Sequence, residues 1–454
     1  MDIDQTAATR ISARIERLPV SAWHWRALSI CGVADFMDAF DSLTLAFVMP
    51  VLARLWKIGP SEIGYLISAG FIGQAIGAVA LSYAAERYGR VRLLAWTLMA
   101  IAIFSLLCAW AWDFQSLFWL RTIQGLAIGA EVPIAATYMN EVVMARRRGT
   151  FTLGIQAIFG FGVLVSSFIA AQLAPLLGWQ SLFIIGASPA LLALPLPWLL
   201  PESPRWLANV GRGEEAEANM RRIEAIASRG GTRPLPEPNL DVPPPQGAEG
   251  GFMRLFDGIY ARRTLGCWIL MFTNAYVAYS LLTWIPSIFS TVYKLPVEEA
   301  LNNTLIVGIF GFCGTLSALF IIDRIPRRLY FLIAFVGCGA SLLTLGLIGA
   351  GISTWLLVTL LSLARAFAAL SQTGIFVYVP EVYPTRIRAL GVGVASAWQR
   401  VASVIGPIVI GYVLANFSVS AVYFMFAIVA AAGAANVVLL LIEGRGKVLE
   451  ELSP

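Results

Sequence analysis

AERYGRVR at residues 85–92 and DRIPRR at residues 323–328 are two short charged strings in an otherwise apolar chain. Each string follows a pair of long hydrophobic segments and precedes another long hydrophobic segment. A unit that recurs about half a chain apart predicts a membrane protein built from two similar bundles of helices. Aligning the two strings matches Glu86 with Asp323, Arg87 with Arg324, Gly89 with Pro326 and Arg90 with Arg327.

The composition excludes an ordinary soluble domain. The 454 residues are 58% hydrophobic and 13% charged, whereas a soluble domain has about 25% charged residues. The apolar stretches are too long for barrel strands, and backbone in lipid must form its own hydrogen bonds, so we expect helices. We predict an all-α membrane protein with twelve transmembrane helices in two pseudo-symmetric six-helix bundles. The expected spans are 26–53, 61–85, 91–112, 116–140, 150–174, 179–200, 263–291, 297–322, 328–350, 354–380, 386–415 and 419–442.

The basic residues predict the orientation of the chain. Of the 32 Lys and Arg residues, 26 fall in loops and chain ends on one side of the expected spans, and three fall in loops on the other side. By the positive-inside rule, both termini and the central loop are expected to be cytoplasmic. Residues 1–25 are polar, and the first apolar span is too long for a cleavable signal peptide. We therefore expect a multi-pass protein of a bacterial-type inner, or cytoplasmic, membrane.

Residues 201–262 form the one long polar segment inside the chain. The segment begins with PESPRWL, continues as a charged amphipathic stretch at about 213–229 that predicts a helix, and then becomes the proline-rich run PLPEPNLDVPPPQ. It is too short to bury a core of its own. We therefore predict a bundle over residues 1–200, a cytoplasmic linker with an amphipathic helix over 201–262, and a second bundle with a short tail over 263–454.

The half-chain repeat extends to the ends of the fourth and tenth expected spans. YMNEVVMARRRG at 138–149 and YVPEVYPTRIRALG at 378–391 share an aromatic residue, a glutamate three residues later and then a basic cluster. Arginines of the charged strings lie near these glutamates and near helix C-termini, where cations are favoured. We expect them to form gating pairs that latch the two bundles together, or to serve only as topogenic charge. The expected gating residues are Glu86, Arg87, Gly89, Arg90, Glu141, Asp323, Arg324, Arg327 and Glu381.

Three carboxylates follow one face of the first expected span, because Asp35, Asp38 and Asp41 are each three residues apart. Ionisable groups inside a bilayer are costly and mark transport pathways or proton relays. Carboxylates this close cannot all ionise comfortably, and a carboxylate that exchanges a proton is what a proton-coupled carrier needs. We expect Asp38 and Asp41 to act in proton coupling. The alternative is that one of them caps or pairs with an arginine of a neighbouring helix.

Arg121 and Glu131 lie ten residues apart on the fourth expected span, roughly 15 Å along a helix axis. They cannot pair with each other, so each needs a partner on another helix. Arg121 is the expected partner of the carboxylates in the first span. Glu131 is either a second protonation site or the acceptor of a buried hydrogen bond.

Arg365 and Arg400 have no carboxylate within their own spans. The guanidinium group matches a carboxylate, so an anionic substrate is an attractive counter-ion for them. The alternative for Arg400 is a pair with Glu381 or with a carboxylate of the first bundle. The polar and aromatic residues expected to add substrate contacts are Asn274, Tyr276, Tyr279, Trp284, Gln372, Trp398 and Gln399.

Several motifs resemble the major facilitator superfamily over essentially the whole chain. AERYGRVR resembles that superfamily's loop between helices 2 and 3, with Glu86 where aspartate is usual, and DRIPRR resembles its second copy, with Pro326 where glycine is usual. PESPRWL is similar to the sugar-porter and organic-ion branches. DAFD at 38–41 is similar to the DGxD motif of aromatic-acid/proton symporters, with Ala39 replacing glycine. GAEVP at 129–133 together with PEVYPTRIRALGVG at 380–393 resembles the niacin-transporter and synaptic-vesicle-protein-related branch.

The resemblance implies alternating access. It also implies that Asp38 and Asp41 act in coupling or gating with Arg121 as their partner, and that Arg87, Gly89 and Arg90 form the gating loop. We expect a symporter that imports a small organic monocarboxylate, such as nicotinate or a benzoate, together with protons. The alternatives are a sugar or polyol porter, a proton-antiport exporter of drugs or organic cations, and a transporter-like sensor.

No Walker A loop, catalytic Ser/His/Asp or Cys/His set, or metal-ligand cluster occurs in the sequence. We therefore expect no enzyme activity, no cofactor, no metal and no nucleic-acid partner. The expected partners are the substrate, protons and the lipid bilayer, and we expect a monomer.

Overall fold

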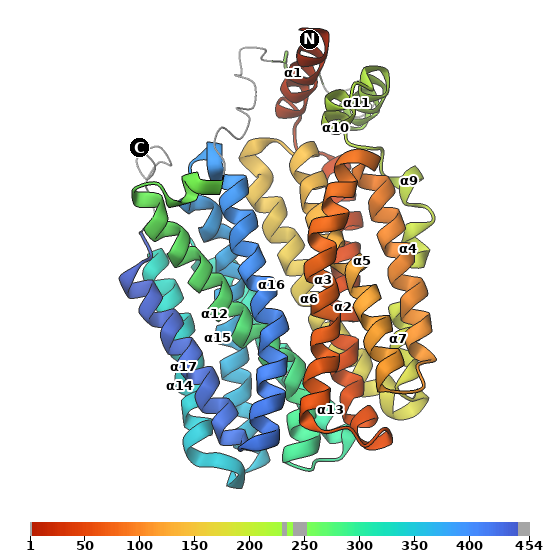
Figure 1. The fold of residues 1–454 in the computed structure, drawn as a ribbon. Helices are drawn as coiled ribbons and strands as arrows, with labels where there is room; N and C mark the ends of the chain where they lie inside the picture. The colour runs from red at the N-terminus through yellow and green to blue at the C-terminus, as the bar shows by residue number, and fades with distance from the viewer. Residues whose placement is uncertain (1, 229–233, 239–251, 444–454) are drawn as a thin grey trace.

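The computed structural model describes residues 2–228, 234–238 and 252–443. Over these ranges the chain forms helices and no strand. The proline-rich run beyond residue 238 and the tail beyond residue 443 lie outside the described residues. Long helices run side by side, and the shorter helices α1, α10 and α11 lie beyond one end of them (Figure 1).

The helices of the first part of the chain follow the predicted spans closely. The long ones are α2 (Ala22–Leu55), α3 (Pro60–Tyr88), α4 (Arg90–Ala109), α5 (Phe114–Val142) and α6 (Arg148–Leu177), the last preceded by the short helix η1 (Ala145–Arg147). The shorter ones are α1 (Asp2–Glu16), α7 (Gln180–Gly186), α8 (Ala190–Ala193), α9 (Leu196–Leu199), α10 (Pro204–Asn209) and α11 (Gly213–Ala227). The predicted amphipathic helix near 213–229 corresponds to α11.

The second part of the chain begins with η2 (Phe252–Phe256). Its long helices are α12 (Ile259–Ser287), α13 (Val297–Ile321), α14 (Arg327–Ile348), α15 (Thr354–Val382), α16 (Thr385–Asn416) and α17 (Val419–Leu439). A π-helical turn, η3 (Ile288–Val292), extends α12, and η4 (Gly349–Gly351) follows α14.

Within the described ranges, ten helices are long and apolar enough to cross a membrane. The helix over the fourth predicted span, α5, is a continuous 29-residue helix, but Arg121, Gln124 and Glu131 reduce its mean hydropathy. The prediction of a continuous helix over 179–200 is wrong. That segment is divided into α7, α8 and α9, because Pro189 and Pro195, which lack a backbone N–H, stand immediately before α8 and α9, while Pro197 lies in the first turn of α9.

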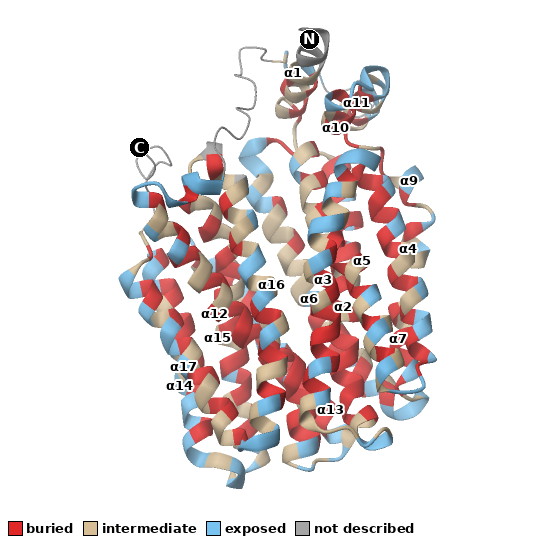
Figure 2. Ribbon diagram, viewed as in Figure 1, coloured by how far each residue is buried: buried red, intermediate tan, exposed pale blue. Residues whose placement is uncertain are grey.

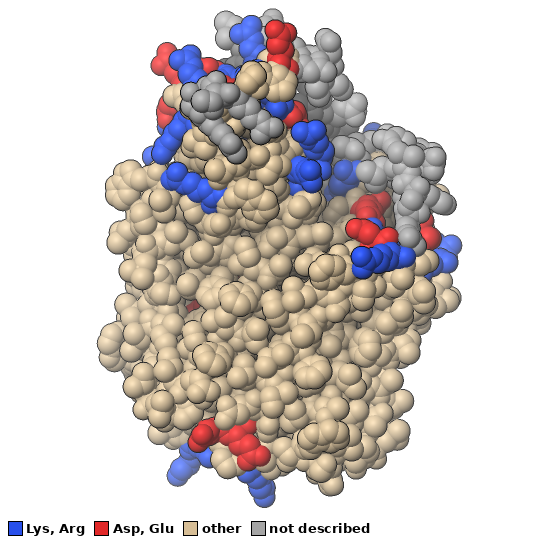
Figure 3. Space-filling view, turned by 180° about the vertical axis from the view of Figure 1, so that it is seen from behind, with Lys and Arg blue, Asp and Glu red and all other residues tan. Residues whose placement is uncertain are grey.

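Charge and burial are distributed as a membrane protein requires. Charged side chains gather at the two ends of the molecule, mostly at the end that carries α1, and a broad band between them is almost free of charge on the face shown (Figure 3). Buried residues concentrate where the long helices face one another, whereas many exposed residues on the outer faces are large and hydrophobic (Figure 2). The chain is a multi-pass membrane protein.

The same packing pattern occurs in both halves of the chain. α3 packs against α5 and α2 against α6 in the first half, while α13 packs against α15 and α12 against α16 in the second. The halves meet where α3 packs against α16, α6 against α13 and α2 against α12.

Glycines allow the backbones of α3 and α5 to approach closely. A Cβ on Gly77 would lie 1.9 Å from the carbonyl oxygen of Leu126, and one on Gly129 would lie 2.1 Å from that of Gln74. Small residues at such spacing let membrane helices pack backbone to backbone. The contact therefore holds α3 and α5 as a closely fitted pair.

α1 is held on the linker helices by ion pairs outside the long helices. Arg14 contacts Glu217 and Glu224 of α11, each at 2.5 Å, and Arg17 contacts Glu224 at 2.5 Å. Burial raises the pKa of Glu224, but hydrogen bonds from Arg14 and Arg17 outweigh this effect, so the net pKa lies below its usual value. Glu16 adds a pair with Arg205 of α10 at 3.0 Å. These contacts attach α1 to the first half of the chain through α10 and α11.

Replacing Gly77 with Ala is expected to destabilise the protein. The added methyl group forces apart two helices in backbone contact, and overpacking of this kind costs about 1–3 kcal/mol. Thermal unfolding of the purified protein in detergent measures the effect. Gly149→Ala is the control, because a Cβ there has no atom within 4 Å among the described residues. Equal melting temperatures for the two variants would contradict the proposed close packing.

Candidate functional site

The first charged string forms a compact cluster between α3 and α4. Gly89 makes the turn with a φ of 104°, where a side chain would also collide with Glu202. Arg90 then reaches back, and its Nη2 lies 2.9 Å from both Glu86 and Glu141. Its Nη1 donates to the Ala85 carbonyl at 2.8 Å. The cluster ties the α3–α4 turn to the end of α5.

The second charged string repeats this arrangement. Arg327 Nη2 lies 3.1 Å from Asp323 and 3.0 Å from Glu381, and Nη1 donates to the Ile322 carbonyl. The residue aligned with Gly89 is Pro326, which precedes α14. Residues that the alignment matches, such as Arg90 with Arg327 and Glu86 with Asp323, therefore make equivalent contacts in the two halves.

Two glutamates complete these clusters, and sequence reasoning missed both. Glu202 accepts hydrogen bonds from the backbone N–H groups of Arg90 and Val91 at the start of α4, and Glu443 does the same for Arg327 and Arg328 at the start of α14. A carboxylate at a helix N-terminus is favourable. The available signal was the pair LLPE at 199–202 and LLIE at 440–443.

The ion pairs of these strings lie within each half and do not cross between halves. Arg90 contacts only acids of the first half, and Arg327 only acids of the second half. The other two arginines of the expected latch, Arg87 and Arg324, are exposed. Among the described residues none of these ion pairs joins one half to the other, and the latch between the bundles stays a prediction. Glu141 lies in the last turn of α5 and contacts Arg90, and Glu381 lies in the last turn of α15 and contacts Arg327.

The first half contains a fully buried ion pair between α2 and α5. Arg121 Nη1 lies 2.9 Å from Asp41 Oδ2, as the sequence predicted for Arg121 and the span 1 carboxylates. Gln124 bridges the pair, since its Nε2 donates to Asp41 at 2.8 Å and its Oε1 accepts from Arg121 at 2.8 Å. Phe183 covers the guanidinium at 5.9 Å from its ring centre. Asp41 is thus compensated by charge and by hydrogen bonds.

Asp38 faces the second half of the chain. It accepts a hydrogen bond from the Ser42 hydroxyl at 3.1 Å, and Gln74 Nε2 of α3 donates to Ser42 at 3.2 Å. Gln74 in turn accepts from Arg400 Nη1 of α16 at 2.5 Å. Arg400 also interacts electrostatically with Asp38. Among the described residues no ion pair joins Arg400 to a carboxylate; its hydrogen-bond partner is the amide of Gln74.

Asp35 and Glu131 are buried acids without compensating partners. Neither carboxyl oxygen of Glu131 has a hydrogen-bond partner among the described residues, and Asp35 Oδ1 has none either. Glu131 interacts electrostatically with Asp38, Asp35 and Asp41. Burying an ionised carboxylate without a partner is costly.

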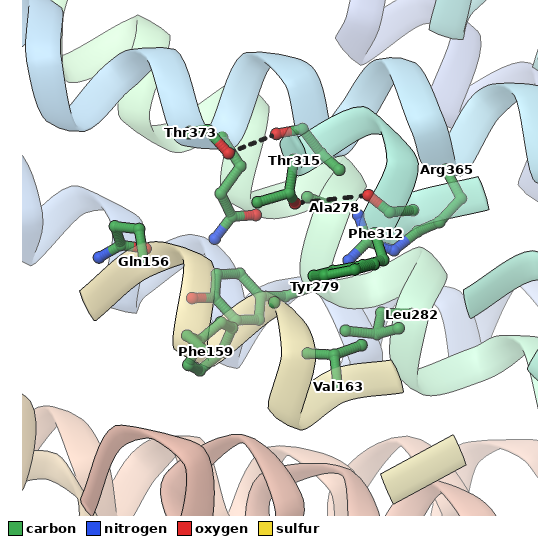
Figure 4. A pocket seen from close by; sticks show the side chains of 14 residues that line it. Gln156, Phe159, Val163, Ala278, Tyr279, Leu282, Phe312, Thr315, Arg365 and Thr373 are labelled. Atoms are coloured by element: carbon green, nitrogen blue, oxygen red, sulfur yellow. Dashed lines mark hydrogen bonds between the residues drawn. The ribbon is translucent and has the colours of Figure 1, made fainter. Parts of the chain in front are cut away.

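A cavity lies between the two halves of the chain, among α6, α12, α13 and α15. Its volume, counted as the space open to the centre of a water molecule, is about 30 Å³. Figure 4 shows how its side chains converge. Phe159 of α6 and Phe312 of α13 supply aromatic surface, while Gln156 and Gln372 supply amides.

Arg365 of α15 is the charged residue that lines the cavity. It is 7% exposed, and its Nε and Nη1 have no hydrogen-bond partner within the described ranges. Gly311 makes room for it, because a Cβ at that position would lie 3.3 Å from Arg365 Nε. The hydroxyls of Thr315 and Thr373, which also line the cavity, donate to the carbonyls of Gly311 and Ala369 in their own helices. A buried cation in this state fits an anionic ligand.

The predicted substrate residues divide into two groups. Arg365, Tyr279 and Gln372 line the cavity together. The others lie elsewhere or support its wall: Asn274 donates to the Ala368 carbonyl, Tyr276 contacts Met425, Trp284 is fully buried, Trp398 packs on Trp268, Gln399 donates to Tyr279, and Arg400 contacts Gln74.

The sequence did not single out Gln156, Phe159, Phe312 or Thr315 as lining residues. Aromatic, amide and hydroxyl side chains in an apolar span are usually ordinary packing residues, so no pattern distinguished these four. The rotation of each helix about its own axis decides which of its residues face the cavity.

Comparison with solved structures places the fold. The structure of the inward-open xylose transporter XylE from E. coli matches with a TM-score of 0.75 and 20% identity, over 94% of this chain and 99% of that chain. At this level of identity the similarity shows the fold alone, which is that of the major facilitator superfamily. Together with the sequence comparisons below, the fold defines a multi-pass membrane transporter and not an enzyme.

The chain belongs to the family described as "Sugar (and other) transporter", whose model matches residues 59–454. The niacin transporter NiaP of Acinetobacter baylyi is 33% identical over 97% of this chain and 99% of its own length. The 4-hydroxybenzoate transporter PcaK of the same organism is 30% identical over 95% of this chain and 94% of its own length. These similarities agree with the niacin and aromatic-acid branches that the motifs indicated.

Replacing Arg121 with Gln is expected to destabilise the protein by about 3–5 kcal/mol, because Asp41 would be left buried without its counter-charge. The double variant Asp41→Asn/Arg121→Gln removes both charges and should recover most of that loss. Thermal unfolding in detergent measures both variants. Arg221→Gln, at an exposed position of α11, is the control. If the double variant were no more stable than Arg121→Gln alone, the pair would not be energetically coupled.

Proposed function

We propose that this transporter imports a small organic monocarboxylate, aromatic in character such as nicotinate or a benzoate, together with protons by alternating access. The observation that carries the proposal is the buried guanidinium of Arg365 in a cavity between the two halves, whose Nε and Nη1 have no hydrogen-bond partner among the described residues. Relatives named as niacin and 4-hydroxybenzoate transporters support the same class of substrate.

The cavity suggests how such a substrate would bind. Its carboxylate would accept hydrogen bonds from Arg365, whose planar donors match carboxylate geometry. Its ring would lie against Phe159 and Phe312, and its polar edge would face Tyr279, Gln372 or Gln156. Gln399 would orient Tyr279 through their 3.4 Å hydrogen bond. In this proposal Arg400 acts outside the substrate contacts, and Asn274, Tyr276, Trp284 and Trp398 shape the surrounding helices.

The proposed proton pathway lies in the first half of the chain. Asp38 faces Arg400, which makes it the carboxylate best placed to exchange a proton between the halves. Glu131 lies deeper and would hold a second proton, because no cation balances it among the described residues. Asp41 and Arg121, locked in their own pair, would set the position of α2 and the electrostatic field around Asp38.

We also propose the arrangement of the chain in the membrane. Residues 1–200 and 263–454 would form two six-helix units with twelve spans in all, and residues 201–262 would link them on the cytoplasmic side of an inner membrane. α5 and the interrupted segment α7–α9 would supply the two spans beyond the ten strongly apolar helices. The charged end around α1, α10 and α11 supports a cytoplasmic location for this face. Under this proposal the clusters at Arg90 and Arg327 would gate by fixing the helices of each half as a unit.

Uptake of radiolabelled nicotinate or benzoate into proteoliposomes is expected to rise with an inward proton gradient. Asp38→Asn should keep substrate counterflow but lose gradient-driven accumulation, since its amide cannot release a proton. Uptake that is indifferent to collapse of the gradient would contradict symport. Uptake of hexoses or polyols in place of acids would favour the sugar-porter alternative.

Replacing Arg365 with Ala is expected to weaken monocarboxylate binding at least about tenfold, because a charge-assisted hydrogen bond contributes about 1.5–3 kcal/mol. Arg365→Lys should retain part of the affinity, since it keeps the charge but loses the planar donors. The stabilisation of purified protein by added ligand, followed by thermal shift, measures binding. Arg221→Ala, an exposed α11 residue, is the control. Unchanged affinity in Arg365→Ala would remove this residue from the substrate site.

A further inference from the structure

A glutamine joins the proposed proton site to the contact between the two halves. Gln74 is 3% exposed on α3, between Arg400 of α16 and Ser42 of α2. Its backbone is held by the close packing of α3 on α5, where Gly129 leaves room for its carbonyl oxygen. The side chain therefore lies at a fixed point between an arginine of one half and a hydroxyl of the other.

The hydrogen bonds through Gln74 have one possible direction. A guanidinium only donates, so the amide oxygen of Gln74 must face Arg400. The amide nitrogen then faces Ser42 and donates to its oxygen, and the Ser42 hydrogen is left to point at Asp38. All three bonds run from the cation toward the carboxylate. An ionised Asp38, which only accepts, is the natural end of this chain.

The same two helices are in close contact beside this chain of bonds. Ser68 of α3 donates to the Val404 carbonyl of α16 at 2.8 Å. Toward the start of α3, a Cβ on Gly64 would lie 2.5 Å from the Pro407 carbonyl, and one on Gly411 would lie 2.5 Å from the Pro60 carbonyl. The contact thus continues to the end of the molecule opposite α1 (Figure 1).

We propose that Gln74 is a positioning residue that couples the protonation of Asp38 to the contact between α3 and α16. The proposal rests on the proposed function, because it takes Asp38 as the site of proton exchange. While Asp38 is ionised, its negative charge polarises the three hydrogen bonds, and these bonds strengthen one another up to the positive charge of Arg400. When Asp38 takes up a proton, the chain loses its anionic end and Arg400 loses its counter-charge. The contact between α3 and α16 then weakens and the end opposite α1 opens.

Other charged or titratable groups also face Asp38, and the test must separate them from Gln74. They are Asp35 and Asp41 on α2, Glu131 on α5, Tyr279 on α12 and Arg400 on α16. None of them can replace the bridging amide. Gln74→Leu leaves all these groups in place and removes only the connection, whereas Gln74→Glu leaves them in place and adds a carboxylate beside Arg400.

The experiment measures the distance between α3 and α16 as the pH changes. Spin labels are placed at Tyr65→Cys and Tyr412→Cys, two exposed positions beside Gly64 and Gly411, with Cys313 replaced by Ala. In the otherwise unchanged protein, the population with separated helices should grow as the pH falls. Asp38→Asn, which mimics the neutral acid, should be separated at every pH. Gln74→Leu should lose the pH dependence, and Gln74→Glu should hold the helices together at lower pH through a direct pair with Arg400.

A transport assay distinguishes a positioning role from a merely structural one. Gln74→Leu should reduce gradient-driven accumulation about fivefold or more, the lower range of coupling between sites, and leave counterflow nearly unchanged. A distance profile for Gln74→Leu that follows pH as in the unchanged protein would overturn the proposal. If Gln74→Leu fails to fold, the prediction for Gln74→Glu decides the question. If Asp38→Asn loses coupling while both Gln74 variants behave as the unchanged protein does, this inference is wrong and the proposed function stands. If uptake does not depend on protons, the proposed function itself is wrong.

Discussion

A charge that is removed from water must be compensated inside the protein, and this constraint orders the whole molecule. Arg121 and Asp41 satisfy it with an ion pair and a bridging amide. Arg90 and Arg327 satisfy it at the ends of the long helices, among acids and carbonyls of their own halves. Arg365 does not satisfy it from the described residues. Its Nε and Nη1 have no hydrogen-bond partner among those residues, and this is the reason for placing the carboxylate of the proposed substrate beside Arg365.

The close packing of helices determines which parts of the protein move together. Glycine contacts fix α3 to α5, and the clusters around Arg90 and Arg327 fix the turns before α4 and α14 to the ends of α5 and α15. Between the halves the contacts include close backbone approaches, aromatic pairs such as Phe71 with Tyr279, and hydrogen bonds from Ser68 and through Gln74. The charged clusters therefore join helices of one half, whereas α3 and α16 join the two halves.

Sequence reasoning predicted the helices because the length of an apolar segment is a local property. It also predicted the partner of Arg121, because few acids lay in neighbouring spans. It did not predict the interruptions over 179–200, where Pro189 and Pro195 end the helical hydrogen bonding of an apolar segment. Nor could it separate Arg365 from Arg400, since both are lone arginines in apolar spans. The rotation of each helix places Arg365 in the cavity and Arg400 against Gln74, and a helix that is apolar on all sides carries no pattern that fixes its rotation.

The attachment of α1 has a consequence for measuring motion in this protein. Its ion pairs join it to α10 and α11, and these helices pack on α5 and α2 of the first half. A fluorescent domain fused ahead of α1 would thus travel with the first half. Paired with a second fluorophore at the exposed Arg324, in the turn before α14, it would report a relative movement of the halves as a change in energy transfer, without a label inside a membrane-spanning helix.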